Sequence, residues 1–434
     1  MMQVQFVEIA LSIVLMIVVN RSLGPEGRGL WNAAFIIPLL VSSLGMLAMP
    51  DAVLYYASSE PHRRLEIFWD AVLLCLFLGP VYSLVMLLFA HQIMTYVVPN
   101  VPHLLFAVAV ATIPVNMIVI NVSTFMFAQG RTLHYRLPEL ADRVVGLGGM
   151  VLALAVLDWG VTGAVLVTAA GRIVALVVAL AILPIRRWWP TGWSLEPARA
   201  VGLLRYGAGV TVANVGVKLA FHLDQLLLNA LQGPVALGLY ATAVRLAQPP
   251  AMVATNMRMV WFAEVASREG AIRPEETMRA TRRLTIVQAA IYPLYGLACA
   301  LLIPLVFGEA FRPSVGPLII LLVGSAVLSQ SSAFVGALTG AGKPNSLIVP
   351  SWVTLAASAV GYVVFVQAFG LYGAAIGYVL GASVFLAMVY RQWATMIGHR
   401  ELRDFVWRRS DVPDVVYRAA SRVGVLLQRQ GSRR

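Results

Sequence analysis

The sequence predicts an all-α polytopic membrane protein of about twelve transmembrane helices. Hydrophobic residues make up 59% of the 434 residues and charged residues only 12%, whereas about 25% of a typical soluble domain is charged. The charges are also clumped, because residues 71–130 and 344–390 contain no Asp, Glu, Lys or Arg. About 20 apolar residues cross a bilayer as a helix, so each of these stretches can hold two crossings. Both stretches are apolar on every face, which excludes the alternating pattern of a transmembrane barrel.

Twelve spans can be drawn along the chain. They lie at residues 3–19, 30–57, 68–90, 101–127, 137–157, 161–183, 201–228, 235–262, 284–307, 315–338, 346–369 and 372–396. The fifth is the weakest span, because Glu139, Asp142 and Arg143 fall in its first turns.

Basic residues divide the connecting loops into two classes. Loops after odd-numbered spans hold only Arg21, Arg28 and Arg312. Loops after even-numbered spans, with their flanks, hold Arg63, Arg64, Arg131, Arg136, Arg143, Arg186, Arg187, Arg199, Arg268, Arg273, Arg279, Arg282, Arg283 and Lys343. Because basic loops stay in the cytoplasm, this pattern predicts a multi-pass protein of the bacterial inner membrane with both termini cytoplasmic. The same rule explains the net charge of +12 without a nucleic-acid partner.

The two halves of the chain resemble each other. At an offset of 209 residues, one set of positions recurs: Asn20, Gly24, Pro25, Gly29, Leu30 and Ala34 match Asn229, Gly233, Pro234, Gly238, Leu239 and Ala243. At offsets of 212 and 210, Gly130 recurs as Gly342 and Gly160 as Gly370. The pattern predicts a duplicated six-helix unit, with residues 1–190 and 200–398 as two bundles related by an axis along the membrane normal.

Three cations are predicted at mid depth in three different spans: Arg172, Lys218 and Arg245. A charge at the bilayer centre costs about 2.5–3.5 kcal/mol on insertion scales, so such residues tend to face a cavity and carry function. Three cations at one depth favour a water-filled positive cavity that binds an anion. Two of these cations could instead have purely structural roles. Arg245 could bond backbone carbonyls, and Lys218 could form an ion pair with Glu8, which lies at a similar depth.

Acidic and titratable residues near these cations are candidates for ion coupling or charge pairing. They are Glu8, Asp51, His222 and Asp224. Lys218, His222 and Gln225 follow a spacing of four and three residues, which predicts one common helix face. His222 can equally be a packed polar residue.

Signatures of enzymes are missing from the sequence. It contains no HExxH, GxSxG, CxxC or Walker motif, so we predict neither catalysis nor a metal or other cofactor. Residues 340–344 (GAGKP) lack the spacing of a phosphate loop and are predicted to form a turn.

Two segments resemble a known family. Residues 20–30 (NRSLGPEGRGL), and Asp224 with the following residues 226–228 and 238–241, resemble motifs of bacterial polysaccharide-export flippases. The resemblance implies the fold of the multidrug/oligosaccharidyl-lipid/polysaccharide exporter superfamily, with two six-helix bundles around a central cavity. Arg21 falls on the family's arginine and Asp224 on its aspartate, whereas Gln225 replaces a basic residue.

The resemblance implies a flippase that moves undecaprenyl-diphosphate-linked oligosaccharide, or a similar anionic glycolipid, by alternating access. We expect Arg21, Arg172, Lys218 and Arg245 to bind it. Membrane lipids and other polysaccharide-assembly proteins are the expected partners. The Asn-Leu-Leu-Arg-Arg segment of lipid II flippases is missing, which argues against a peptidoglycan precursor. A cation-coupled multidrug extruder is the alternative within the superfamily, and a glycan polymerase or ligase is the alternative outside it.

Residues 399–434 form a basic cytoplasmic tail by this topology. Its apolar residues recur at helical spacing, which favours an amphipathic helix on the anionic inner leaflet. A solvated, unstructured tail is the alternative.

The topology can be tested with reporter fusions. A fusion at Arg273 should report a cytoplasmic position and a fusion at Asn100 an outer position, because their loops differ in basic charge. Equal readouts from the two fusions would contradict this topology.

Overall fold

The computed structural model describes residues 2–47, 49–50, 52–53, 62–183, 197–268 and 271–398. Within these ranges the chain forms helices and no strand, which confirms the all-α prediction. The helices are α1 (Met2–Gly45), α3 (Arg64–Leu88), α4 (Ala90–Tyr96), α5 (His103–Ala128), α6 (Thr132–Met150), α7 (Gly160–Ala181), α9 (Pro197–Ser267), α10 (Pro274–Phe307), α11 (Val315–Gly340), α12 (Ile348–Phe369) and α13 (Leu371–Ile397). A π-helical turn, Val151–Val156, extends α6.

The predicted spans are present as helices. Nine helical stretches of the described chain are long and apolar enough to cross a membrane. Two of them, in α1 and α9, contain two crossings each, because the backbone turns at Gly24 and Gly233. The charged helix α6 is the twelfth crossing. The protein is therefore a multi-pass membrane protein, while Asp51 and the predicted tail lie outside the described residues.

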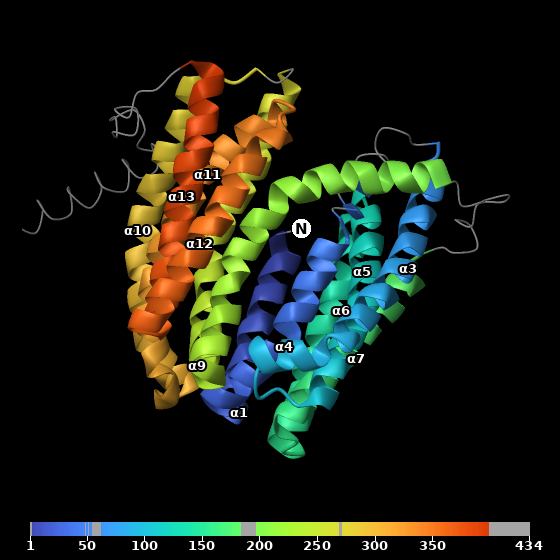
Figure 1. Cartoon of the computed structure of the whole chain (residues 1–434), viewed down its shortest axis with the longest axis vertical. Helices are drawn as coiled ribbons and strands as arrows, with labels where there is room; N and C mark the ends of the chain where they lie inside the picture. The colour runs from blue at the N-terminus through green and yellow to red at the C-terminus, as the bar shows by residue number, and fades with distance from the viewer. Residues whose placement is uncertain are drawn as a thin grey trace, which may run out of the picture.

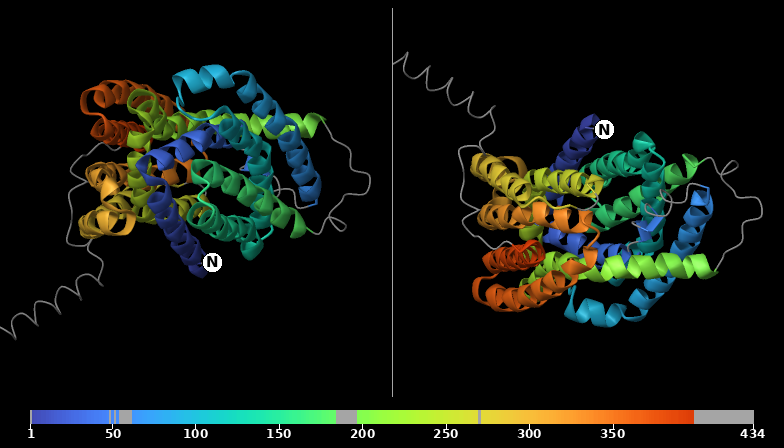
Figure 2. Two further views of the ribbon diagram at one scale, coloured as in Figure 1. Left: turned by 90° about the horizontal axis from the view of Figure 1, so that it is seen from below. Right: turned by 90° about the horizontal axis from the view of Figure 1, so that it is seen from above.

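The helices form two groups with α1 and α9 between them. Helices α3 to α7 lie on one side of the molecule and α10 to α13 on the other (Figure 1). α1 packs on α5, α6 and α7, whereas α9 packs on α11, α12 and α13, and the two long helices also pack on each other. The first part of α9 crosses the end of the molecule where α3 begins, before the helix turns down (Figure 1). The first part of α1 projects from the bundle in both end views (Figure 2).

The internal repeat is visible in the backbone. Three pairs of glycines at repeat-related positions adopt nearly equal positive φ angles. They are Gly24 (64°) with Gly233 (82°), Gly130 (72°) with Gly342 (73°), and Gly160 (56°) with Gly370 (54°). Only glycine adopts this region without strain, so the repeated glycines fix the same turns in both halves.

A close backbone contact joins the two halves just after the Gly24 and Gly233 turns. A Cβ atom on Gly29 would overlap the carbonyl of Pro234, and one on Gly238 would overlap the carbonyl of Pro25. The two contacts are related by the repeat. They let α1 and α9 cross with touching backbones, which no larger residue would permit.

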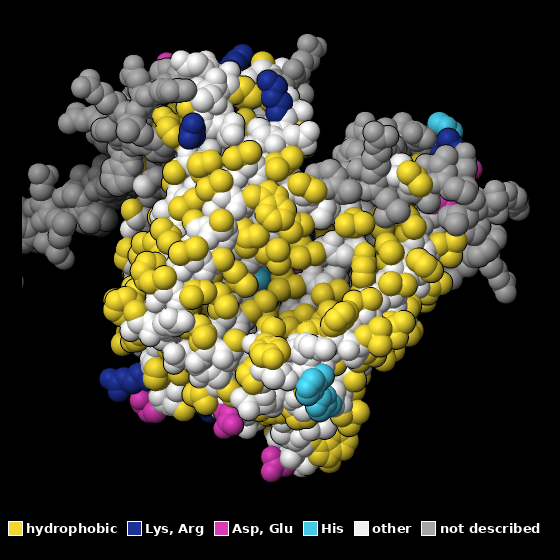
Figure 3. Space-filling model, viewed as in Figure 1, with side chains coloured by type: hydrophobic (Ala, Val, Ile, Leu, Met, Phe, Trp, Pro, Cys, Tyr) yellow, Lys and Arg dark blue, Asp and Glu magenta, His cyan; other side chains and the backbone are white. Residues whose placement is uncertain are grey.

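The outer surface of the molecule is hydrophobic, as expected for a protein surrounded by lipid. Hydrophobic side chains cover the flank of the molecule, and charged side chains lie towards its two ends (Figure 3). On α10, Leu294, Leu301 and Leu305 are each more than two-thirds exposed. In water such a surface would be an aggregation site, whereas in a bilayer it is the lipid-facing surface.

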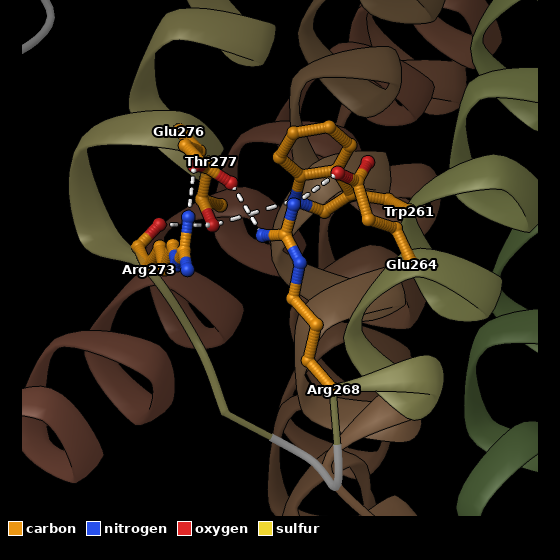
Figure 4. A network of polar contacts seen from close by, with 6 residues as sticks. All are labelled: Trp261, Glu264, Arg268, Arg273, Glu276 and Thr277. Carbon is orange, nitrogen blue, oxygen red and sulfur yellow. Dashed lines mark hydrogen bonds and ion pairs between the residues drawn. The ribbon is translucent and has the colours of Figure 1, made fainter.

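A polar network links the end of α9 to the start of α10 (Figure 4). Arg268 contacts Glu276 and Glu264 at 2.6 Å each, and Arg273 contacts Glu276 at 3.0 Å. The hydrogen bond to Glu276 raises the pKa of Arg268 above its ordinary value. Trp261 adds a hydrogen bond to Thr277. Exposed ion pairs contribute little stability each, but together these contacts define how α10 leaves α9.

Glycine-to-alanine substitutions test the backbone contact. Gly29→Ala and Gly238→Ala should each lower the free energy of unfolding by about 1–3 kcal/mol, because the new methyl group meets a carbonyl. The double variant should fall short of the sum, since both methyl groups disturb one contact. Thermal or denaturant unfolding of the detergent-solubilised protein measures this. Gly148→Ala, where a Cβ meets nothing within 4 Å, is the control and should be neutral; equal behaviour of all three single variants would contradict the prediction.

Candidate functional site

Two adjoining cavities lie between the halves of the molecule. Their volumes are about 310 and 250 Å³. They share the lining residues Leu15, Trp31, Arg143, Arg245 and Gln248, so they lie side by side and are treated together as the central cavity. Residues of α1, α6 and α9 line both, so the space lies where the two long helices cross.

Charged side chains line this space, and most of them are basic. Within the described chain the basic lining residues are Arg28, Arg136, Arg143, Arg172 and Arg245, together with His222. The acidic lining residues are Glu8, Glu139 and Asp142. Five arginines against three carboxylates give the cavity a net positive charge.

Each of the three carboxylates faces an arginine. Glu8 and Arg136 lie 3.0 Å apart, although 128 residues separate them in the chain. Asp142 and Arg172 lie 3.7 Å apart, and Glu139 and Arg143 lie 4.0 Å apart. These pairs lower the free-energy cost of burying charge, and they use three of the five arginines.

Arg28 and Arg245 have no carboxylate partner in the part of the chain that the structure describes. The Arg28 side chain is only 3% exposed, and its Nε atom lacks a hydrogen-bond acceptor. Its guanidinium lies 4.5 Å from the centre of the Trp31 ring, a cation–π contact. Arg245 lines both cavities and is solvent-accessible. These two guanidiniums can therefore bind an anion inside the molecule.

The predicted site residues divide between the cavity and other places. Arg172, Arg245, His222 and Glu8 line the cavity, whereas Lys218 does not. The Lys218 ammonium instead donates to the hydroxyl of Ser43 at 3.1 Å. The backbone of α9 departs from helical geometry at Phe221, between Lys218 and His222, and one common face for Lys218, His222 and Gln225 stays a prediction. The suggested partnership of Glu8 with Lys218 is wrong, since Glu8 pairs with Arg136.

Asp224 is buried away from the cavity. Its carboxylate accepts hydrogen bonds from the Tyr240 hydroxyl at 2.8 Å and from the backbone N–H of Gln225 at 2.7 Å. The neighbouring Gln225 does line the cavity, where its side-chain oxygen accepts a hydrogen bond from Asn32 at 2.9 Å. This bond connects α9 to α1 across the space between the halves.

Arg21 also lies outside the cavity lining. Its guanidinium donates to the carbonyl oxygens of Val306 at 2.7 Å and Leu305 at 3.0 Å. These carbonyls belong to the last turn of α10, where backbone acceptors lack partners within the helix. Arg21 therefore caps α10, and a direct role in substrate binding has no geometric support.

Sequence reasoning missed three lining arginines: Arg28, Arg136 and Arg143. Hydropathy assigned all three to loops or their flanks, because a charge ends an apolar run. A signal did exist on α6, where Arg136, Glu139 and Arg143 follow each other at three and four residues and so share one face. No comparable signal marks Arg28.

The first part of α1 contributes to the cavity wall. Glu8, Ser12, Ile13 and Met16 of α1 belong to the lining, as does Tyr295 of α10. The first part of α1 projects from the bundle (Figure 2), and the lining residue Ile13 is 45% exposed.

Comparison with known proteins assigns the family. Residues 1–263 match the sequence profile of a family described as polysaccharide biosynthesis protein. The chain belongs to this family. No curated protein matches the sequence of this family member.

Solved structures similar to this family member share its fold. A multidrug resistance MATE family transporter of the MOP superfamily matches in its inward-facing conformation with a TM-score of 0.75 and 15% identity, covering 90% of this chain and 94% of that chain. An outward-facing conformation of such a transporter matches with a TM-score of 0.67 and 17% identity, covering 92% and 93%. The lipid II flippase MurJ, inward closed, matches with a TM-score of 0.71 and 9% identity, covering 93% and 88%. The predicted superfamily fold of two six-helix bundles is thereby confirmed.

Replacing Arg21 tests its position at the end of α10. Arg21→Ala should lower the free energy of unfolding by about 1–2 kcal/mol, because two carbonyls lose their donor. Phosphate binding to the purified protein should not change. If the variant keeps its stability but binds the anion more weakly, Arg21 contributes to the binding site instead.

Proposed function

We propose that this protein moves an anionic lipid-linked oligosaccharide from the cytoplasmic to the outer leaflet of the bacterial inner membrane. The observation that carries the proposal is the pair of arginines, Arg28 and Arg245, that line the central cavity without a carboxylate partner. A phosphate or diphosphate at the head of the lipid accepts hydrogen bonds from two guanidiniums in a geometry that lysine cannot match.

The lipid tail need not enter the cavity. We place the opening for the tail at the first part of α1, where the lining residue Ile13 is 45% exposed, so that the head group can occupy the cavity while the tail stays in lipid. This arrangement removes the main energetic barrier, which is the passage of a charged head group through hydrocarbon.

The paired arginines form a second set of contacts for the head group. Arg136, Arg143 and Arg172 each face a carboxylate, so an entering phosphate competes with Glu8, Glu139 or Asp142. Competition of this kind weakens binding, and a carrier needs a head group that leaves as well as binds. Protonation of these carboxylates would change the balance and offers a route for coupling to an ion gradient.

Alternating access follows from the contact between the halves. The close contact at Gly29 and Gly238 lies next to the lining residue Arg28 in the chain, and we assign it to the closed, predicted outer end of the cavity. Rocking of the halves about their interface would separate these glycines and open the cavity to the other side. The cytoplasmic termini and the predicted units 1–190 and 200–398 belong to this proposal, as do partners among other polysaccharide-assembly proteins.

A cation-coupled multidrug extruder is the competing function. Three carboxylates in the cavity could attract a cationic drug. Each of them already faces an arginine, however, and the remaining guanidiniums repel a cation. The charge of the cavity therefore favours the anionic substrate.

A leaflet-resolved assay in reconstituted vesicles tests the function. The double substitution Arg28→Gln, Arg245→Gln should reduce movement of a diphosphate-linked glycolipid about 100-fold, because each charge-assisted contact contributes about tenfold. Lys218→Ala should have a smaller effect, since the Lys218 side chain lies outside the cavity lining.

Arg312→Gln is the control for this assay. It removes one positive charge from an exposed turn and should leave the rate at the parental value. A stably inserted double variant that moves glycolipid at the parental rate would show the proposal to be wrong. Preferential binding of cationic drugs by the purified parent protein would favour the extruder instead.

A further inference from the structure

A second hollow lies on the lipid-facing side of the molecule, away from the central cavity. This groove runs between α10 and α11, has a volume of about 710 Å³, and reaches Leu386 of α13. Apolar side chains line most of it, and its rims are exposed: Leu297 is 63% and Val323 54% accessible. The groove is therefore open along its length towards lipid.

A row of polar side chains interrupts this apolar lining. The amide of Gln330 donates to Gln288 at 2.6 Å, the amide of Gln288 donates to the Tyr292 hydroxyl at 3.4 Å, and Thr285 contacts Gln330 at 3.0 Å. Gln288 and Tyr292 are 5% and 8% exposed, and both line the groove. One amide proton on each glutamine and the tyrosine proton have no acceptor among the described residues. Unpaired donors at the edge of hydrocarbon are costly unless a ligand supplies acceptors.

Two basic residues precede the groove on α10, towards its predicted cytoplasmic end. Arg283 and Arg279 precede Gln288 by about 8 and 14 Å along the helix axis. Arg279 lies 18 residues, or five helical turns, before the rim residue Leu297 and so shares its side of the helix. Both arginines are exposed, and neither forms an ion pair with a carboxylate of the described chain. Along α10 the order is thus cations, amide donors, then apolar wall.

The corresponding pair of helices in the other half of the repeat packs more closely. The equivalent helices are α3 and α5, where a Cβ atom on Gly79 would lie only 2.6 Å from the Cα of Pro114. At Gly296, on the wall of the groove, the nearest atom is a side-chain methyl of Leu322 at 3.3 Å. The close backbone contact that seals the first pair of helices is therefore missing from the second.

From this order of groups we infer that the α10–α11 groove binds one anionic diacyl phospholipid of the cytoplasmic leaflet. The phosphate and the acidic head group lie at Arg279 and Arg283. The ester carbonyls accept hydrogen bonds from the amides of Gln288 and Gln330, and an acyl chain covers the apolar wall. A polyprenyl chain has no acceptor at that depth, so it leaves the amides unpaired.

The bound lipid would position α10. This helix packs mainly on α11, and its Tyr295 forms part of the border of the central cavity. A lipid that fills the groove fixes the spacing of α10 and α11. The inference stands apart from the proposed substrate, because no residue of the groove lines the central cavity.

Native mass spectrometry of the purified full-length protein tests the site, with phosphatidylglycerol and phosphatidylethanolamine as probes. The parent should retain one phosphatidylglycerol in preference to phosphatidylethanolamine. Arg279→Gln with Arg283→Gln should weaken phosphatidylglycerol binding about 25-fold, since each basic residue near the head group contributes about fivefold. Gln288→Leu with Gln330→Leu should weaken both lipids about tenfold. Arg64→Gln, at the corresponding end of α3, should change neither.

Three results would overturn the inference. If the protein retains both phospholipids equally and no variant changes this, the lipids bind non-specifically around the protein and the groove is not a specific site. Displacement of phosphatidylglycerol by undecaprenyl phosphate at equal concentration would mean that the groove holds a polyprenyl tail. A loss in the Arg64→Gln control that is half of the α10 variant's loss on a logarithmic scale would mean a response to net charge alone, because the control removes one positive charge and the α10 variant two. The α10 arginine variant leaves the buried amides intact, so it tests the site even if the leucine variant does not insert.

Discussion

The crossing of α1 and α9 with touching backbones is the constraint on which the rest of the structure depends. Gly29 lies against Pro234 and Gly238 against Pro25, so the two long helices approach closer here than any side chain would allow. Residues of both helices beyond this point line the central cavity. Trp31 and Arg245, which line that space, stand only a few residues beyond the glycines. At this end, the distance between the halves is thus set by Gly29 and Gly238, which carry only a hydrogen atom where other residues carry a side chain.

The charges inside the cavity are arranged so that most buried arginines are compensated while some remain available to bind an anion. Five guanidiniums without compensation would repel one another strongly in a poorly hydrated space. Three carboxylates reduce that repulsion, and each does so from a position next to an arginine. Trp31 offers the negative face of its ring to Arg28, a weaker compensation that leaves the guanidinium edge available. The fold therefore tolerates the buried charges of the cavity, while the guanidiniums of Arg28 and Arg245 remain without a carboxylate partner among the described residues.

The sequence allowed much of the fold to be predicted and about half of the site. Length and hydropathy gave the spans, and repeated glycines gave the duplication, because both signals are local or periodic. The predicted mid-span positions selected Arg172, Arg245 and Glu8, and all three line the cavity. Individual side-chain contacts could not be predicted: Lys218 donates to Ser43 and is absent from the cavity lining. Partners far apart in the chain, such as Glu8 with Arg136 and Arg21 with the end of α10, follow from packing that no local pattern encodes.

The paired glycine contact also bears on how such a protein could arise. In a two-fold homodimer, the same surface patch of each subunit contacts its copy on the other subunit. An ancestral six-helix chain could therefore have formed a dimer through the same glycines. Fusion into one chain preserves that contact and frees every other position to differ between the copies. Arg245 and Arg172 stand where the other half has Ile36 and Ala382. A homodimer would have carried each arginine twice and doubled the repulsion, so one-sided charge is a property that only the fused gene could acquire.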